Sequence, residues 1–299
     1  MPDPAALLAP VATTSALDLL ERFPDEQHCT RLMFDLRGGL TKPCPGCGSR
    51  TRWRQTEAVR MFRSKCCSVP VDALAGTFLT QPPLGARLWL YLIVTFLNRS
   101  TPLSSAFVAA HLGTNSGRSW QALAQLRQHI ATTNKKLFEP VDFRQCYVDE
   151  FLYRPVCVPG GGARTGIWLL GLSGASSIHV EPLRDRLAGA YPSILERMGI
   201  REAEFYSCNL SLAARMKRQG VPRVAACELS MASRGRQLIA SQARLKAFWP
   251  YFRRSMRRGS VVPARQHMGR FVQDYVFRFN HTGSPAAMLR HVLESLDPL

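Results

Sequence analysis

The stretch Cys146-Tyr147-Val148-Asp149-Glu150-Phe151 decides how the chain is interpreted, because an apolar, strand-like run ends there in two adjacent carboxylates. Acidic side chains are scarce elsewhere: 21 Asp and Glu stand against 39 Lys and Arg. The residues before Asp149 contain two groups of cysteines and a helical pattern. The residues after it alternate between strand and helix patterns and predict an α/β core.

Composition and charge narrow the class of protein. At 299 residues the chain exceeds one average domain, so two or three units are expected. The longest candidate for a membrane span, residues 88–97, is about half the required length, and the N-terminus lacks the layout of a signal peptide. We therefore expect a cytoplasmic protein with no membrane partner. The formal net charge of +18 favours a polyanion, by default nucleic acid, and hence association with the nucleoid.

Cysteines form the first motif. Cys44-Pro45-Gly46-Cys47-Gly48 is a CxxC knuckle, in which small residues let backbone amides turn toward thiolate sulfurs. A four-ligand zinc site needs a second pair roughly 15–20 residues later. Cys66 and Cys67 arrive there with irregular spacing, because Ser64 occupies the position that would complete a CxxC with Cys67.

Three arrangements of this unit remain open. Zinc is held by all four cysteines, with Cys66 stretched toward the ion, or His28 or Cys29 supplies the fourth ligand. In the third arrangement the metal is lost, and a small β-hairpin with free cysteines survives on packing. Nine cysteines in a cytoplasmic protein favour thiols or metal ligands over disulfides. Structural Zn²⁺ is therefore the expected cofactor.

A helical pattern over residues 82–130 predicts three helices: 84–97, one that starts at Thr101-Pro102-Leu103, and 116–130. Gly113-Thr114-Asn115 forms the turn of a helix-turn-helix, whose second helix enters the major groove. The side chains expected to contact bases are Ser116, Arg118 and Gln121. Those expected to face inward are Trp120, Leu123, Leu126 and Ile130. A plain three-helix bundle is the alternative.

Strands replace helices after residue 145. The pattern predicts strands at 146–151, 154–158, 167–172 and 177–182, a helix at 184–198, a strand at 204–208, a helix at 210–219, a strand at 223–228, and helices at 238–258, 265–279 and 285–296. These successive strands, followed by alternating helix and strand, describe an RNase H-like α/β core. The expected multidomain α/β chain thus has a helical segment (1–40), a degenerate zinc-ribbon-like unit (41–80), a helix-turn-helix domain (81–132), the core (145–282) and a C-terminal helix (283–299).

Short motifs follow one another along nearly the whole chain. They are Phe23-Pro24-Asp25-Glu26, Cys44-Pro45 with Cys47-Gly48-Ser49, Phe62-Arg63, Gly76-Thr77-Phe78, Val148-Asp149-Glu150, Phe248-Trp249 with Arg253-Arg254, and His267 with Asp274-Tyr275 and Asn280. In order and spacing they resemble bacterial insertion-sequence transposases with an N-terminal zinc ribbon and a DDE catalytic core. The resemblance implies double-stranded DNA as the partner and a homo-oligomer, because transposases act on paired DNA ends.

The catalytic residues depart from this family. The resemblance implies three carboxylates that hold two divalent ions. Asp149 matches the first, but Cys208 and Lys246 stand where the other two are expected. Mg²⁺ prefers hard oxygen to a thiol, and an ammonium repels it. Glu228 could substitute, whereas Glu204 lies four residues early, about 13 Å from the expected place. Mg²⁺ is expected only if the protein is active.

Basic side chains of the core are retained. Four crowd the end of the helix predicted at 238–258: Arg253, Arg254, Arg257 and Arg258. We expect this helix end to face DNA, and a solvated surface is the alternative. Asp149 and Glu150 either bind one ion weakly together or remain as a relic.

These observations predict a transposase-derived, sequence-specific duplex-DNA-binding protein with a degenerate, inactive DDE site. One alternative is an active transposase that performs metal-dependent cleavage and strand transfer with Asp149 and Glu228. The other is a basic interaction factor that binds nucleic acid or an acidic protein without cleavage.

Overall fold

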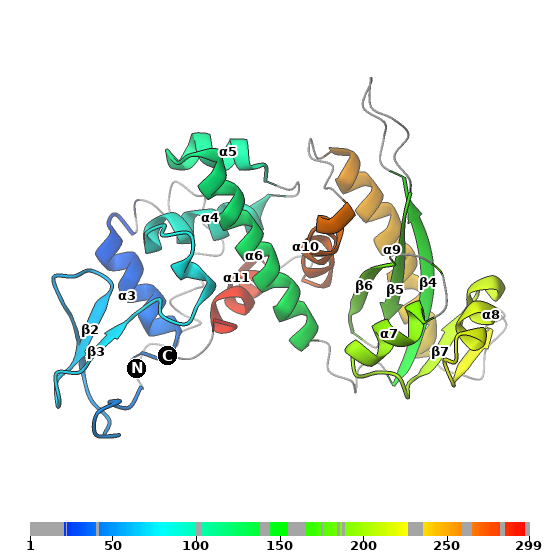
Figure 1. Ribbon diagram of the computed structural model, residues 1–299, viewed down its shortest axis with the longest axis horizontal. Helices are drawn as coiled ribbons and strands as arrows, with labels where there is room; N and C mark the ends of the chain where they lie inside the picture. Colours follow the sequence, from blue (N-terminus) through cyan, green and yellow to red (C-terminus); the bar gives the residue numbers. More distant parts are fainter. Residues whose placement is uncertain are drawn as a thin grey trace. The chain divides into compact units, whose positions relative to one another are not determined.

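The computed structural model describes residues 21–296 except 22, 40–41, 100–102, 138–143, 155–165, 175, 184–185, 187–188, 227–235, 259–264 and 282–284 (Figure 1). The described chain is mixed α/β, with one three-stranded and one five-stranded sheet. It divides into two compact units: residues 1–129 with 281–299, and residues 130–280. Among the described helices, none is long and apolar enough to cross a membrane.

The small sheet of the first unit is antiparallel, and its strands pair in chain order: β1 (Trp53–Gln55), β2 (Met61–Ser64) and β3 (Pro70–Asp72). It packs on α3 (Glu26–Leu36), the helix predicted to start after Asp25. The Phe34 ring of α3 stacks on Phe62 with centroids 3.9 Å apart, and Trp53 meets Phe34 edge-on at 5.8 Å. An aromatic cluster therefore attaches the sheet to the helix.

Four more helices follow in this unit: α4 (Ala86–Asn98), α5 (Ser105–Leu112), α6 (Ser116–Leu137), which continues into the second unit, and α11 (Pro285–Glu294). The Glu26 carboxylate accepts the backbone N–H groups of Ala86 and Arg87 and so caps α4. The C-terminal helix α11 packs on α4 and α3. It therefore belongs to the same unit as the N-terminal helices.

The turn between α5 and α6 follows a helix with a cap at each end. The Ser104 hydroxyl caps α5 by accepting the Phe107 N–H at 3.1 Å. Gly113 ends the helix with φ 61°, a left-handed conformation that favours glycine. The predicted start at residue 101 is wrong, because Ser104 is the N-cap and the helix begins at Ser105. Residues 101–102 lie outside the described part of the chain.

The second unit contains the large sheet, whose strands are β4 (Gln145–Tyr153), β5 (Ile167–Ser173), β6 (Ile178–Leu183), β7 (Glu204–Ser207) and β8 (Val224–Ala226). The order is β6-β5-β4-β7-β8. The first three strands are antiparallel, whereas β7 runs parallel to β4 and β8 parallel to β7. The central strand is therefore β4, which carries Asp149. The strand predicted at 154–158 falls, apart from Arg154, outside the described residues.

The helices of this unit are α7 (Ala190–Arg197), α8 (Leu210–Arg218), α9 (Arg236–Arg258) and α10 (Met268–Asn280). In Figure 1, α9 crosses the sheet, and it packs against β4 and β5, whereas α10 packs against β6. Gly171 of β5, paired with Asp149, permits this approach. A Cβ at Gly171 would lie 2.6 Å from Trp249 Cζ2 and 2.7 Å from Leu245 Cδ1, so a larger residue would push α9 away.

Candidate functional site

The two carboxylates that end the apolar run of β4 point to opposite faces of the sheet, because successive side chains of a strand alternate. Asp149 faces α9, where Trp249 Nε1 donates to its Oδ2 at 3.3 Å. Glu150 faces α7 and α8. The expectation that these two acids could hold one ion together is therefore wrong.

The Glu150 carboxylate is buried and bound by side chains of its own unit. Its side chain is 1% exposed, and its carboxylate lies 2.6 Å from Arg186 Nη2 and 2.5 Å from Arg215 Nη2. The Tyr191 hydroxyl of α7 also donates to it, and the Arg186 guanidinium lies 3.9 Å from the centre of the Trp168 ring. Glu150 thus ties α7 and α8 to the central strand through a buried, charge-assisted network.

The structure brings the three positions of the expected acids together on the α9 face. Tyr147, two residues before Asp149 on β4, interacts electrostatically with both Asp149 and Cys208. Gln242 of α9 donates its Nε2–H to Cys208 Sγ at 2.9 Å. One turn further along α9, the Lys246 charge acts on Asp149 and opposes the rise of its pKa that burial causes. These interactions lie on the face of the sheet that α9 covers.

The chemistry at this point is unlike that of a divalent-ion site. Burial raises the pKa of Asp149, although hydrogen bonds from the Glu150 amide and Trp249 and the charge of Lys246 act in the opposite direction. One carboxylate, one thiol, one amide and one ammonium lie at this point, whereas Mg²⁺ takes oxygen ligands. Within the described residues, Asp149 belongs to no group of side chains close enough to share a metal. Glu228 lies outside the described residues.

Asp149→Asn is expected to stabilise the unit of residues 130–280 at neutral pH. A carboxyl whose pKa is higher in the folded than in the unfolded protein stabilises the fold when protonated. That contribution is complete below the ordinary value of 3.8 and is lost as pH rises through the raised value. The asparagine keeps an acceptor for Trp249 and carries no charge.

Thermal unfolding measured from acid to neutral pH checks this expectation. The unfolding temperature of Asp149→Asn should exceed that of the unaltered protein by an amount that grows with pH. Glu196→Gln, at an exposed acid of the same unit, is the control and should show no such trend. A variant less stable than the parent at neutral pH would contradict the role of burial.

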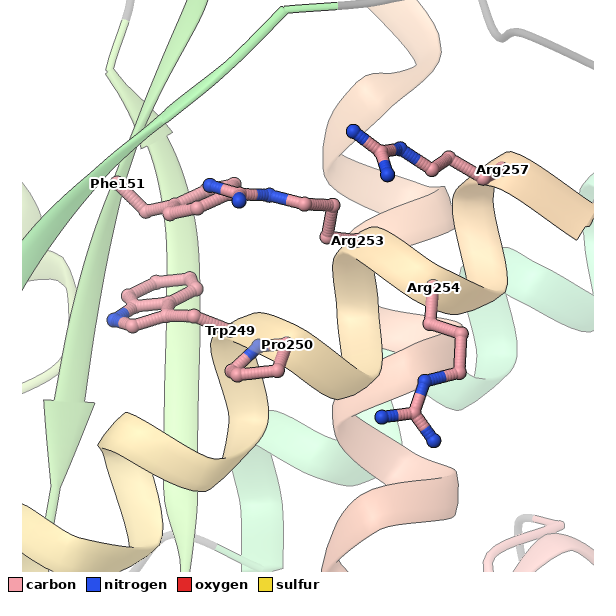
Figure 2. A pocket seen from close by; sticks show the side chains of 6 residues that line it. All are labelled: Phe151, Trp249, Pro250, Arg253, Arg254 and Arg257. Carbon is pink, nitrogen blue, oxygen red and sulfur yellow. The ribbon is translucent and has the colours of Figure 1, made fainter.

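Beside this site α9 lines a cavity of about 480 Å³ (Figure 2). The lining residues are Phe151, Trp249, Pro250, Arg253, Arg254 and Arg257. The Phe151 and Trp249 rings are stacked at 5.0 Å with an interplanar angle of 10°, and Arg253 Cζ lies 5.0 Å from the centre of the Phe151 ring. Three of the four predicted arginines thus surround one cavity; the side chain of Arg258 lies outside the described residues.

The cavity itself was missed from the sequence. The available signal was the spacing of Pro250, Arg253, Arg254 and Arg257, which places them on one face of a helix. Nothing in the sequence indicated that Phe151, about 100 positions earlier, completes the lining.

The predicted DNA-contacting residues lie at the N-terminal end of α6. Asn115 Oδ1 accepts the Arg118 N–H at 2.8 Å and so caps the helix. The side chains of Ser116, Arg118 and Gln121 are exposed. Trp120 is 53% exposed, so the prediction that it faces inward is wrong. The buried stripe begins at Ser119 and continues through Ala122, Leu123, Leu126 and Ile130, which leaves Trp120 on the outer face.

The four cysteines of the two knuckles form one cluster. The sulfur atoms of Cys44, Cys47, Cys66 and Cys67 all lie within 4.8 Å of one another, and Cys47 Sγ lies 3.6 Å from Cys66 Sγ. In a tetrahedral zinc–thiolate site, neighbouring sulfurs are about 3.8 Å apart. The cluster could therefore bind a metal such as zinc.

Adjacent cysteines reach one cluster because the second knuckle is irregular. Ser64 occupies the first knuckle position, and its hydroxyl oxygen lies 3.3 Å from Cys44 Sγ and accepts the Val69 N–H at 3.1 Å. Cys66 contributes the sulfur that Ser64 cannot supply. Ser68 then adopts φ 54°, close to the 69° of Gly48 after the first knuckle.

The two other candidate ligands lie elsewhere. Cys29 is 1% exposed, and its sulfur lies 3.8 Å from the Phe23 carbonyl oxygen. The His28 ring contacts Asp25 at 2.8 Å. Neither belongs to the group of close sulfurs. The geometry thus favours the first of the three predicted arrangements.

Ionisation within the cluster is uneven. The hydrogen bond with Ser64, together with the amides of Gly46 and Cys47, lowers the pKa of Cys44 to about 6. Hydrogen bonds with Cys47 and Cys66 raise the pKa of Cys67 to about 12. Four neighbouring thiolates repel one another, so a bound cation is what allows all four to ionise.

Comparison with known proteins gives no relative for these arrangements. No family model, no curated protein and no solved structure matches the chain. Function therefore has to be inferred from the residues themselves.

Proposed function

We propose that this chain is a transposase-derived protein that binds specific sequences in double-stranded DNA and does not cleave them. The observation that carries the proposal is the environment of Asp149. Trp249 donates a hydrogen bond to the Asp149 carboxylate, and the positive charge of Lys246 attracts that carboxylate. Cys208 is hydrogen-bonded to Gln242. A two-metal mechanism needs carboxylates at the last two positions.

The strand arrangement supports an RNase H-like core. Three antiparallel strands followed by two parallel ones, in the order β6-β5-β4-β7-β8, form the mixed sheet expected of that fold. Asp149 lies on the central strand, Cys208 directly follows β7, and Lys246 lies on the helix that packs against β4. These are the places where the resemblance puts the three acids.

The helix-turn-helix supports binding to a duplex. α6 presents exposed Ser116, Arg118 and Gln121 at its first turns, and side chains of this kind read base edges in the major groove. The net charge of +18 supplies attraction to phosphate. We further propose zinc in the cysteine cluster, a homo-oligomer that holds paired DNA ends, and a location on the nucleoid.

The full chain is expected to bind duplex DNA from the flanks of its own gene more tightly than scrambled duplex. Affinity should fall steeply as salt rises, because phosphate contacts release counterions. Arg118→Gln combined with Gln121→Ala should remove about 1–3 kcal/mol of discrimination per lost base contact. Gln125→Ala, exposed one turn further along α6, is the matched control and should bind as the parent does. Equal affinity for flank and scrambled duplex would contradict sequence-specific binding.

The same duplexes test the alternatives. With Mg²⁺ or Mn²⁺ we expect neither nicking nor strand transfer, from the parent or from Asp149→Ala. Metal-dependent cutting that disappears in Asp149→Ala would establish an active transposase. Equal affinity for single-stranded RNA and duplex DNA would favour a basic interaction factor.

A further inference from the structure

The cavity beside α9 contains cations without acidic partners. Arg253, Arg254 and Arg257 line it, all three are exposed, and among the described residues none forms an ion pair with a carboxylate. In contrast, Arg186 and Arg215 of the same unit are bound to Glu150. Guanidinium groups that face a cavity without partners suit phosphate, which accepts hydrogen bonds in the planar geometry that arginine offers.

The other part of the lining is apolar. The Trp249 and Phe151 rings stack in parallel as a short column, and the Arg253 guanidinium lies over the Phe151 ring (Figure 2). Pro250 is exposed beside the column. A guanidinium plane can stack on a nucleic-acid base. An exposed guanidinium held over an aromatic ring therefore offers a surface on which a further flat ring can stack.

We propose that this cavity binds one nucleotide with an unpaired base. The base stacks on Arg253 against the apolar lining, and the phosphate is bound by Arg257 or by Arg254, whose side chains point to different sides of α9 (Figure 2). The volume of about 480 Å³ lies within the range of small-ligand sites, roughly 300–1,000 Å³. A paired base is enclosed in its duplex, so only an unpaired base reaches such a cavity.

This inference rests on the proposed function and deepens it. It assigns the second unit a strand with an unpaired base, in addition to the duplex that α6 binds. A site for duplex phosphates alone would need only cations, whereas here three of six lining residues are apolar. Such apolar groups favour a ligand that removes a ring from water. Two sources share this chemistry: a free nucleotide and a nucleotide within a single strand.

The test uses the full chain and fluorescence anisotropy. The ligands are a short labelled oligothymidylate, the same strand with abasic sites, and unlabelled dTMP as a competitor. The variant is Arg254→Gln combined with Arg257→Gln. The control, Arg197→Gln combined with Arg201→Gln, removes the same charge from exposed positions of the same unit.

We expect the cavity variant to bind oligothymidylate about tenfold more weakly, and the control to bind it nearly as the parent does. The abasic strand should also bind the parent roughly tenfold more weakly, because stacking is lost. Equal losses in variant and control, or equal binding of the abasic strand, would overturn the proposal. Competition by dTMP would support it with a free nucleotide as ligand, and failure of dTMP to compete would support a strand.

Failure of this inference is separable from failure of the proposed function. Arg118→Gln with Gln121→Ala should weaken duplex binding and leave oligothymidylate binding unchanged. Duplex binding without a contribution of the cavity arginines to single-strand binding would overturn the cavity proposal alone. Single-strand binding that needs Arg254 and Arg257, without any affinity for duplex, would overturn only duplex recognition.

Discussion

Glu150→Gln is expected to lower the free energy of unfolding of the unit formed by residues 130–280 by about 3–5 kcal/mol. The glutamine retains the shape of the side chain but removes the charge that Arg186 and Arg215 share. Both guanidiniums would then face each other across a buried site without an anion. The Tyr191 hydroxyl would also exchange a carboxylate acceptor for a weaker amide.

Denaturant unfolding of two variants at adjacent positions checks this expectation. Asp149→Asn makes the same chemical change one residue earlier, on the opposite face of the sheet, and should be stabilising near pH 7. A similar loss of stability in both variants would mean that the carboxylates have equivalent surroundings. The affinity of the folded protein for duplex DNA should be unchanged in Glu150→Gln. The contacts of Glu150 are with Arg186, Tyr191 and Arg215, which lie outside α6.

Purified protein is expected to contain one zinc ion per chain, and Cys66→Ala is expected to lose it. Removal of one thiolate from a four-sulfur site should lower metal affinity by several orders of magnitude. Because structural zinc in zinc-finger peptides binds with about 10–16 kcal/mol, the cysteine knuckles should lose several kcal/mol of stability. The aromatic cluster of Phe34, Trp53 and Phe62 should still hold the small sheet on α3.

Metal content by atomic absorption and thermal unfolding with and without a chelator provide the measurement. Cys29→Ala is the matched control, since it removes a buried thiol of the same unit that lies outside the cluster. It should retain a full equivalent of zinc. Retention of zinc by Cys66→Ala, or its loss in Cys29→Ala, would show that the ligand set is different.

The sequence predicted most elements of the second unit, because strands with two-residue periodicity and helices with 3.6-residue periodicity alternate clearly after residue 145. The prediction from the sequence failed where the hydrophobicity of a side chain does not match the face of the helix on which it lies. Trp120 is apolar, so it was placed inward, yet the helix is phased by the buried residues Ser119, Ala122 and Leu126. A small polar residue on the inner face gives no hydrophobic signal.

The positions of the candidate site came from a resemblance, and its detail could not be predicted. The places of Asp149, Cys208 and Lys246 were those that the resemblance implies. Their surroundings were not predicted, because the partner of Asp149 is Trp249, 100 positions away, and Glu150 is bound by arginines of other elements. The spacing of Cys66 and Cys67 was misleading for a related reason: it did not reveal that Cys66 supplies the sulfur missing at Ser64.

Gly171 has a consequence for the history of this chain. Without a side chain at Gly171, the Trp249 indole lies directly on β5, close enough to donate its N–H to Asp149. If the protein descends from a transposase, restoring Cys208→Asp and Lys246→Glu would return two acids but leave Asp149 bound to a core tryptophan. Recovery of a metal site would also require α9 to repack against the sheet. In that case, the packing at this glycine would prevent single substitutions from restoring a metal site.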